Sequence, residues 1–225
     1  DVDRCVEARI AATRSLFPSI SVAGVATEHV WDSSVRRLDV FDGADRLGVA
    51  YLDLAARPGK VTGAAHFTVR GGCSVSASDA PHIAESDFFS ADRRSPTSWG
   101  FDEQPLRQLP TVALVCSFAP QLSHADLETL LHEWGHALHS LLSETTAQHL
   151  SGTRGATDVV ELASTLVEGL AWHAPLLRTA LDGDADQALE GLRRARAATR
   201  GGDAHRQLRL AAFDQALHGN THMAD

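Results

Sequence analysis

Two histidines four residues apart, with a glutamate directly after the first, stand in the stretch LLHEWGHALHSLL at residues 130–142. On an α-helix, residues four apart lie one turn apart on the same face, so the imidazoles of His132 and His136 can bind one ion. Glu133 lies beside that ion, where it can act as a general base without being a ligand. This HExxH arrangement is typical of zinc peptidases. We therefore predict one zinc ion per chain and Glu133 as the catalytic residue.

The residues around the motif strengthen this interpretation over a chance match. The apolar side chains at helical spacing predict a buried helix, and they are Leu127, Leu130, Leu131, Trp134, Ala137, Leu138, Leu141 and Leu142. Polar groups without partners are costly inside a core. His132, Glu133 and His136 therefore need a joint explanation, which a metal site provides.

Two histidines leave a tetrahedral zinc ion short of one protein ligand and one water. We predict Glu161, in the segment TDVVELASTLVE, as the third ligand, because a carboxylate from a separate helix would close the site. His139 is the alternative. It follows His136 by three positions, but three ligands on one continuous helix turn around its surface and seldom converge on a small ion.

Three further residues have candidate supporting roles. Glu168 lies two turns after Glu161 on the same predicted helix and is placed to accept the free N–H of a zinc-binding histidine, which would fix the tautomer of that histidine. The alternative for Glu168 is a salt bridge at the wall of the cavity. Asp158 is placed for the same task or for capping its helix. If His139 is not a ligand, we expect its ring to bond a nearby carboxylate or carbonyl or to cap the helix.

The elements that must position these residues are two helices and a strand. Ser123 is placed to cap the first helix, with Asp126 in its first turn, and we predict that this helix spans residues 124–143. A second helix is predicted over 157–177, because no helix breaker precedes Gly169, and it should end near Pro175. The β-branched run TVALVCSF at residues 111–118, bounded by prolines, predicts a buried or edge strand.

The rest of the chain predicts a mainly α fold with a small β-sheet, an α+β class. Residues 5–17 predict a helix, 47–54 and 64–69 predict strands, 29–41 predict a strand or irregular structure, and 73–110 predict a long loop. After residue 184 we predict two amphipathic helices separated by Gly201 and Gly202, the second ending at Gly219. Functionally, residues 1–120 would form the edge of a cleft and residues 121–225 the zinc-binding segment.

Composition excludes several classes of protein. The chain has 225 residues, a formal net charge of -9 and 44% hydrophobic residues, so a folded core is expected rather than disorder. The negative charge argues against a nucleic-acid surface. The Arg193, Arg194 and Arg196 cluster has acidic neighbours, which favours a solvated helix face. No apolar run reaches the roughly 18 residues that a membrane span requires.

The cysteines and the N-terminus bear on the compartment. Cys5, Cys73 and Cys116 are odd in number and widely spaced, so we predict small buried thiols in a reducing compartment rather than disulfides. The chain opens at Asp1 without a basic segment followed by an apolar one, so no signal or transit peptide is visible. We therefore expect a processed chain or a fragment.

The segments LLHEWGHALHSLLS and QHLSGTRGATDVVELASTLVE resemble the catalytic segment of the thimet oligopeptidase family of zinc metallopeptidases. Upstream, YLDLAARPGKVTGAAHFTVRGG resembles the strand pair beside the substrate cleft of that family, and AFDQALHG resembles a helix after its zinc site. The similarity runs from about residue 40 to residue 219, and within the family it is greatest to the mitochondrial intermediate peptidases, which share the GTR and HALHS details.

The resemblance implies that His132, His136 and Glu161 are zinc ligands, that Glu133 is the base, and that peptides or precursor proteins are substrates. For intermediate peptidases it also implies a mitochondrial matrix enzyme that removes an N-terminal octapeptide from imported precursors. The alternatives are a cytoplasmic, thimet-type oligopeptidase of short peptides and a zinc-binding fragment that binds peptides without turnover. We expect the peptide to pair with an edge strand, either 64–69 or 111–118.

The chain also departs from the family pattern. Val159 and Ala163 stand where the family usually has Phe and Pro, which predicts slightly looser packing of the helix that carries Glu161. Family members are much longer and carry a C-terminal loop rich in His and Tyr that stabilises the tetrahedral intermediate. The single tyrosine of this chain is Tyr51, in the upstream strand region. We therefore expect the oxyanion donor to be missing and cleavage to be weak.

Overall fold

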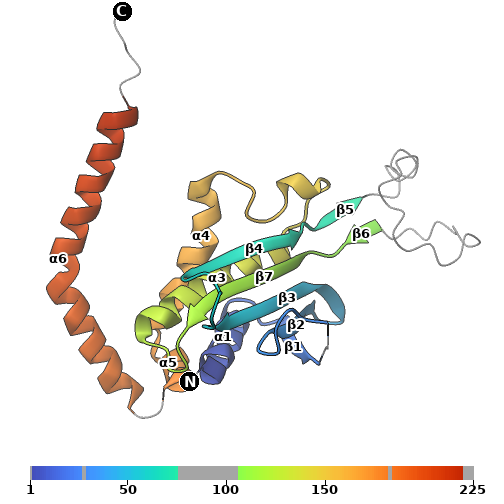
Figure 1. Cartoon of the computed structure of the whole chain (residues 1–225), viewed down its shortest axis with the longest axis horizontal. Coiled ribbons are helices and arrows are strands. Elements are labelled where there is room, and N and C mark those ends of the chain that lie inside the picture. Colours follow the sequence, from blue (N-terminus) through green and yellow to red (C-terminus); the bar gives the residue numbers. More distant parts are fainter. Residues whose placement is uncertain (1, 27–28, 76–105, 182–183, 220–225) are drawn as a thin grey trace, which may run out of the picture. The chain divides into compact units, whose positions relative to one another are not determined.

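The structure, a computed structural model, describes residues 2–26, 29–75, 106–181 and 184–219 (Figure 1). It is mainly α with a small β-sheet, as predicted. The helices are α1 (Val2–Leu16), α3 (His124–Leu142), α4 (Thr157–Glu168), α5 (Ala174–Ala180) and α6 (Ala185–His218), with short 3-10 turns η2 (Gln148–Leu150) and η3 (Gly169–Trp172). The strands are β1 (Ile20–Val25), β2 (Arg36–Asp42), β3 (Asp45–Ala55), β4 (Ala64–Arg70), β5 (Cys73–Val75), β6 (Leu106–Gln108) and β7 (Thr111–Phe118).

Five strands form the main sheet in the order β1-β2-β3-β7-β4. All neighbours are antiparallel except β3 and β7, which are parallel. The strands predicted over 47–54, 64–69 and 111–118 correspond to β3, β4 and β7. Strand β7 lies inside the sheet, between β3 and β4, and β4 lies at its edge. The prediction that β7 is a buried or edge strand is thus resolved in favour of the buried position.

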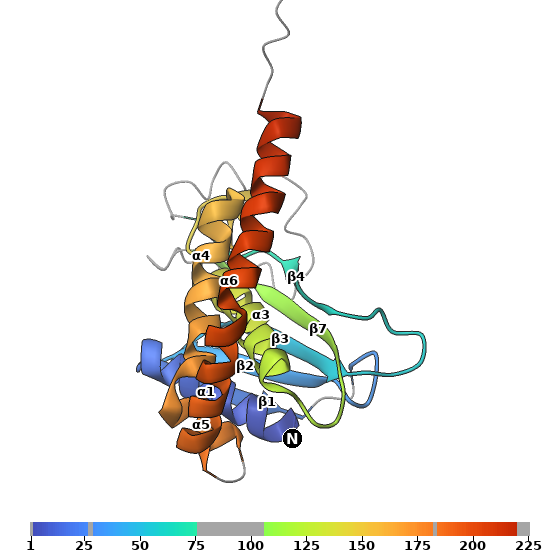
Figure 2. The same ribbon diagram turned by 90° about the vertical axis from the view of Figure 1, so that its left-hand side faces the viewer.

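Helix α3 packs on the sheet through β7, β4 and β3, and α4 packs against α3. Figure 2 shows β4 and β7 on one side of α3 and α4 on the other. Helix α3 begins at the predicted residue, because Ser123 and Asp126 form a reciprocal capping box. On the face turned away from the histidines, Trp134 donates a 2.8 Å hydrogen bond to Thr13 of α1. The guanidinium of Arg9 covers the Trp134 ring at 4.0 Å, so α1 and α3 are joined by polar as well as apolar contacts.

The second predicted helix, over 157–177, is wrong in its extent. Helix α4 ends at Glu168, η3 follows, and α5 begins at Ala174. Gly169 caps α4, which fits the low helix propensity of glycine. Pro175 does not end the helix; it lies in the first turn of α5, where a missing N–H leaves no hydrogen bond unmade.

Two features of the first half of the chain were missed. Strand β1 had no clear signal, because Ile20 is its single buried residue. It pairs with β2, which covers the end of the ambiguous 29–41 stretch. Within the expected 73–110 loop, β5 and β6 pair at the two ends. The residues between them, 76–105, including SADRRSPTSWGFDEQP, lie outside the described residues.

The prediction of two helices separated by Gly201 and Gly202 is wrong, because α6 runs unbroken from Ala185 to His218 (Figure 1). Each glycine costs a helix about 1 kcal/mol relative to alanine. The flanking alanines, leucines and arginines favour the helix enough to offset that cost. Asp184 caps the N-terminus of α6 by accepting hydrogen bonds from the N–H groups of Asp186 and Gln187.

Contacts divide the chain into two compact units, residues 1–180 and 181–225. The first contains the β-strands, α1 and α3 to α5, and the second contains α6. The functional division at residue 120 stays a prediction. All three cysteines are free thiols, with Cys5 and Cys116 buried and Cys73 partly exposed. No helix in the described part of the chain is long and apolar enough to cross a membrane.

The C-terminal end of β3 is held by a buried carboxylate, Asp53, which is 2% exposed. It accepts hydrogen bonds from the Trp31 indole at 2.8 Å, the Arg57 guanidinium at 2.5 and 2.8 Å and the Lys60 ammonium at 2.7 Å. Burial would raise the pKa of Asp53, but these hydrogen bonds outweigh burial and hold the pKa far below its usual value. Asp53 thus ties the 56–63 connection to the sheet.

We predict that Asp53→Asn lowers the free energy of unfolding at pH 7 by about 3 kcal/mol, because it leaves the Lys60 ammonium buried without its counterion. The folded-state pKa of Asp53 lies below the unfolded value of about 3.9. Its contribution is therefore present above about pH 4 and is lost as the pH falls toward the folded-state pKa. Urea unfolding from pH 7 down to pH 3 measures this, with the exposed Asp42→Asn as the control. The prediction would be contradicted if the difference in free energy of unfolding between the two variants did not shrink below pH 4.

Candidate metal centre

The structure brings His132, His136 and Glu161 together. One donor atom from each residue lies within 4.8 Å of the others. The Nε2 atoms of His132 and His136 lie 3.3 and 3.4 Å from the same oxygen of Glu161, Oε2. The two imidazole rings stand nearly perpendicular, with their centroids 4.8 Å apart. Two imidazole nitrogens and one carboxylate oxygen thus lie close together, and this group could hold a metal ion.

The third donor reaches the histidines because α3 and α4 approach closely at Gly135. A Cβ atom at this position would lie 2.6 Å from the Cα of Ser164 and 2.8 Å from the carbonyl oxygen of Ala163. Both distances are shorter than real Cβ contacts allow, so only glycine fits without moving a helix backbone. Gly135 lies between the two histidines in the sequence, and the closest approach of the helices therefore falls at the site itself.

Ser164 holds the Glu161 carboxylate in place. Its hydroxyl donates to Glu161 Oε2 at 2.7 Å, the same oxygen that faces both histidines. This hydrogen bond lowers the pKa of Glu161, with smaller contributions from the charges of His136 and His132. Glu161 is therefore held ionised. Its side chain is 44% exposed, so the group opens to solvent on the α4 side.

Glu168 contacts the other nitrogen of the His132 ring. Its Oε2 lies 2.9 Å from His132 Nδ1. Because an ionised carboxylate can only accept, Nδ1 carries the proton in this pair. In the neutral ring, Nε2 is then unprotonated and turns its lone pair toward Glu161.

Glu133 and His136 lie deeper, against the sheet. Each is 9% exposed. Burial raises the pKa of the Glu133 carboxyl, and the charge of His132 and a backbone hydrogen bond from His66 oppose part of that rise. Burial likewise lowers the pKa of His136. A carboxyl with a raised pKa exchanges protons closer to neutral pH, which suits a general base.

The remaining predicted residues lie around the centre in different ways. His139 is in the last turn of α3, and its Nδ1 is buried without a hydrogen-bond partner among the described residues. It is not a member of the converging donor group. Asp158 does not cap α4, whose N-cap is Ala156; its Oδ1 accepts instead from the N–H of Val159.

Three residues that contact the site were not predicted. Gly135 and Ser164 lie where α3 and α4 meet, and His66 lies on strand β4. His66 Nε2 lies 3.3 Å from the Ser140 hydroxyl, and its ring centroid lies 6.0 Å from that of His136. Burial, together with the charges of His136 and His139, lowers the pKa of His66 to about 4. Nothing in the local sequence pattern signals these contacts.

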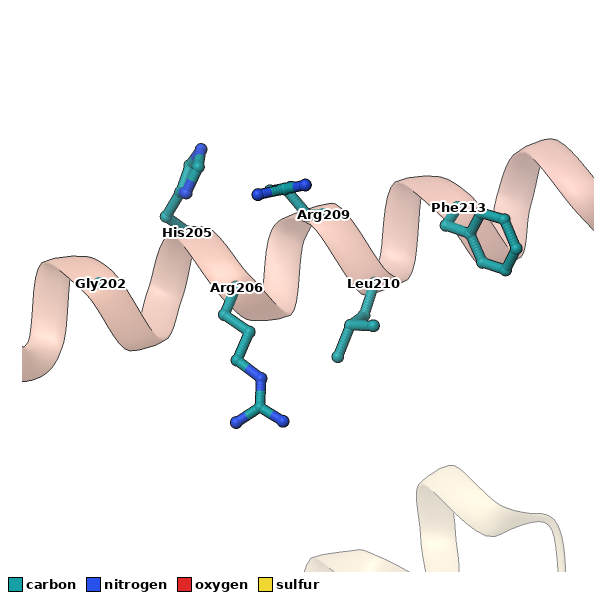
Figure 3. Close-up of a pocket in the computed structure, with 6 residues that line it drawn as sticks. All are labelled: Gly202, His205, Arg206, Arg209, Leu210 and Phe213. Atoms are coloured by element: carbon teal, nitrogen blue, oxygen red, sulfur yellow. The ribbon is translucent and has the colours of Figure 1, made fainter.

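A hollow on α6 does not have the character of an active site. It is lined by Gly202, His205, Arg206, Arg209, Leu210 and Phe213. All six belong to one helix, and in Figure 3 His205 and Arg209 project to one side while Arg206 and Leu210 project to the other. The side chains spread around the helix and do not converge, so they form no enclosed site.

Comparison with known proteins identifies the family. The sequence matches Peptidase family M3 over residues 7–224. The chain belongs to this family. Membership in the M3 family confirms the resemblance drawn from the HExxH and GTRGATDVVELASTLVE segments.

Curated proteins similar to this chain include mitochondrial intermediate peptidases of three fungi. That of Aspergillus niger is 43% identical over 169 residues, which cover 69% of this chain and 21% of the relative. That of Coccidioides immitis is 37% identical over 91% of this chain and 28% of the relative. That of Phaeosphaeria nodorum is 38% identical over 85% of this chain and 27% of the relative. The chain thus spans about a quarter of the length of these relatives.

We predict that Gly135→Ala lowers the free energy of unfolding by about 1 to 3 kcal/mol, because the added methyl forces α3 and α4 apart. Alanine favours helices more than glycine does, so any net loss must come from this contact. Gly169→Ala is the matched control, since no atom lies within 4 Å of its Cβ position. Urea unfolding of both variants without metal tests the prediction. Equal free energies of unfolding for the two variants would show that a methyl group at residue 135 fits between α3 and α4.

Proposed function

We propose that this chain is the catalytic region of a zinc metallopeptidase. His132, His136 and Glu161 would bind one zinc ion, and Glu133 would be the general base. The convergence of two imidazole nitrogens on one carboxylate oxygen is the observation that carries this proposal. Membership in peptidase family M3 supports the reaction class.

The donor set fits zinc in its chemistry, and the spacing of Glu161 from each histidine fits a tetrahedral ion. Structural and catalytic zinc sites use imidazole and carboxylate donors, and ligands about 2.0–2.1 Å from a tetrahedral ion lie roughly 3.3–3.4 Å from each other. The distances from Glu161 Oε2 to the two histidine nitrogens are 3.3 and 3.4 Å.

The contact between Glu168 and His132 supports the same assignment. The Glu168 carboxylate can accept the Nδ1 proton of His132, which leaves Nε2 free to bind a metal ion.

A zinc ion bound here would polarise the scissile carbonyl and acidify the attacking water. Glu133 would accept a proton from that water as it attacks, and would then return the proton to the leaving amine. Its buried position and raised pKa suit both transfers. Glu168 would keep the His132 ring in the tautomer that binds metal.

Strand β4 is the surface on which we place the peptide. It is an edge strand that pairs with β7 alone among the described strands, so its other edge can pair with an extended peptide. Strand β7, the second candidate from the sequence, is paired on both sides and cannot take this role. Main-chain pairing accepts many sequences, and the exposed Phe67 and Val69 of β4 would add apolar contacts.

For the substrate, we propose precursor proteins from which an N-terminal octapeptide is removed in the mitochondrial matrix. The fungal relatives named mitochondrial intermediate peptidase support this choice over thimet-type cleavage of short peptides in the cytoplasm. The second candidate is zinc and peptide binding without turnover.

We predict that Glu133→Gln lowers cleavage of a quenched-fluorescent peptide by roughly 100-fold to 10,000-fold, the usual contribution of a general base. Bound zinc should be unchanged, because Glu133 is not a ligand. A chelator should abolish cleavage by the unmodified chain, and Glu144→Gln, an exposed glutamate, serves as the control.

Retained cleavage by Glu133→Gln would exclude Glu133 as the base. Zinc binding without cleavage by the unmodified chain would favour the second candidate.

A further inference from the structure

His66 contacts the metal centre from the sheet, on the side of α3 that faces β4. Its ring lies next to that of His136, with centroids 6.0 Å apart and planes inclined by 39°. A residue of the edge strand thus lies beside a candidate zinc ligand.

We propose that His66 is a positioning residue that fixes the ring of His136 and links it to strand β4. The proposal rests on the proposed function, because it assumes that His136 binds zinc and that Glu133 acts on a peptide paired with β4. It assigns His66 no contact with metal or substrate.

The two candidate histidine ligands are held differently, which is why His136 needs such a residue. His132 is oriented by the hydrogen bond from its Nδ1 to Glu168. The Nδ1 of His136 is buried and has no hydrogen-bond partner among the described residues. Packing must therefore fix the His136 ring.

The ring of His66 is itself anchored, so it can supply that packing. Its Nε2 lies 3.3 Å from the hydroxyl of Ser140, one turn after His136 on α3. Ser140 is 1% exposed and lies beneath Gly152, whose Cβ position would be 2.7 Å from the Ser140 hydroxyl. The contacts that lead from Gly152 through Ser140 to His66 are thus close, and the last of them places His66 against His136.

This link has a consequence for the geometry of the reaction. A peptide paired with β4 takes its position from the strand, and the zinc ligands take theirs from α3. His66 joins the two elements at the site, so it would set the register between the scissile bond and the groups that act on it.

The test compares His66→Leu, His66→Gln and Ser140→Ala with the unmodified 225-residue chain. Phe67→Leu is the matched control, because it is the next residue on β4 and is 53% exposed. Zinc affinity is measured by competition with a chromophoric chelator. The visible spectrum of the cobalt(II) form reports ligand geometry, and urea unfolding without metal reports stability.

We expect His66→Leu to weaken zinc binding by about tenfold, as is usual when a residue that orients a ligand is lost. It should also change the cobalt spectrum. His66→Gln should recover part of the affinity, since its amide nitrogen can replace Nε2 against Ser140. Ser140→Ala should weaken binding less than His66→Leu, and Phe67→Leu should stay within twofold of the unmodified chain.

Zinc affinity and a cobalt spectrum unchanged in His66→Leu would overturn the proposal, whatever the effect on stability. If His66→Leu does not fold, His66→Gln and Ser140→Ala decide, and the proposal is overturned if both match the unmodified chain. Failure of the proposed function gives a different result, because the unmodified chain itself would then bind no zinc.

Discussion

The site depends on one geometric constraint. A single α-helix can direct two imidazoles, four residues apart, at one ion, but a third donor must come from an element pressed against it. Here that element is α4, and the contact is possible because Gly135 removes the side chain at the point where the helices touch. The capping box of α3, the sheet beneath it and the Ser164 bond to Glu161 all maintain the same approach.

Burial divides the site into two sides with different tasks. Glu133 and His136 face the sheet and are nearly enclosed, whereas Glu161 and Glu168 on α4 are partly open to solvent. The enclosed side is where the pKa of Glu133 is raised, and the open side is where Ser164 keeps Glu161 ionised. A single pair of packed helices thus provides one carboxylate suited to proton transfer and another suited to metal binding.

Much of the site could be predicted because its signals are local. The spacing of His132 and His136, the Ser123 cap and the β-branched run of β7 each act within one element, and the structure places those elements as predicted. Glu161 was also predicted, since zinc chemistry demands a third donor and the next helix offers a carboxylate.

The residues and elements that were missed depend on contacts between distant parts of the chain. Gly135, Ser164 and His66 matter because of what lies opposite them, which a single sequence does not reveal. Strand β1 forms by pairing with β2 despite a weak pattern of its own. The errors in the helices have a related cause: Gly169 ends α4, yet Gly201 and Gly202 do not break α6. Glycine lowers helix stability by a modest amount, and its neighbours decide the outcome.

The most direct test of the central claim is the zinc content and affinity of the chain compared with those of Glu161→Ala and His139→Ala. We predict one zinc per chain in the unmodified protein, a loss of affinity of at least tenfold in Glu161→Ala and a smaller change in His139→Ala. Full zinc affinity in Glu161→Ala, or no zinc in the unmodified chain, would contradict the convergence of α3 and α4 on a metal ion.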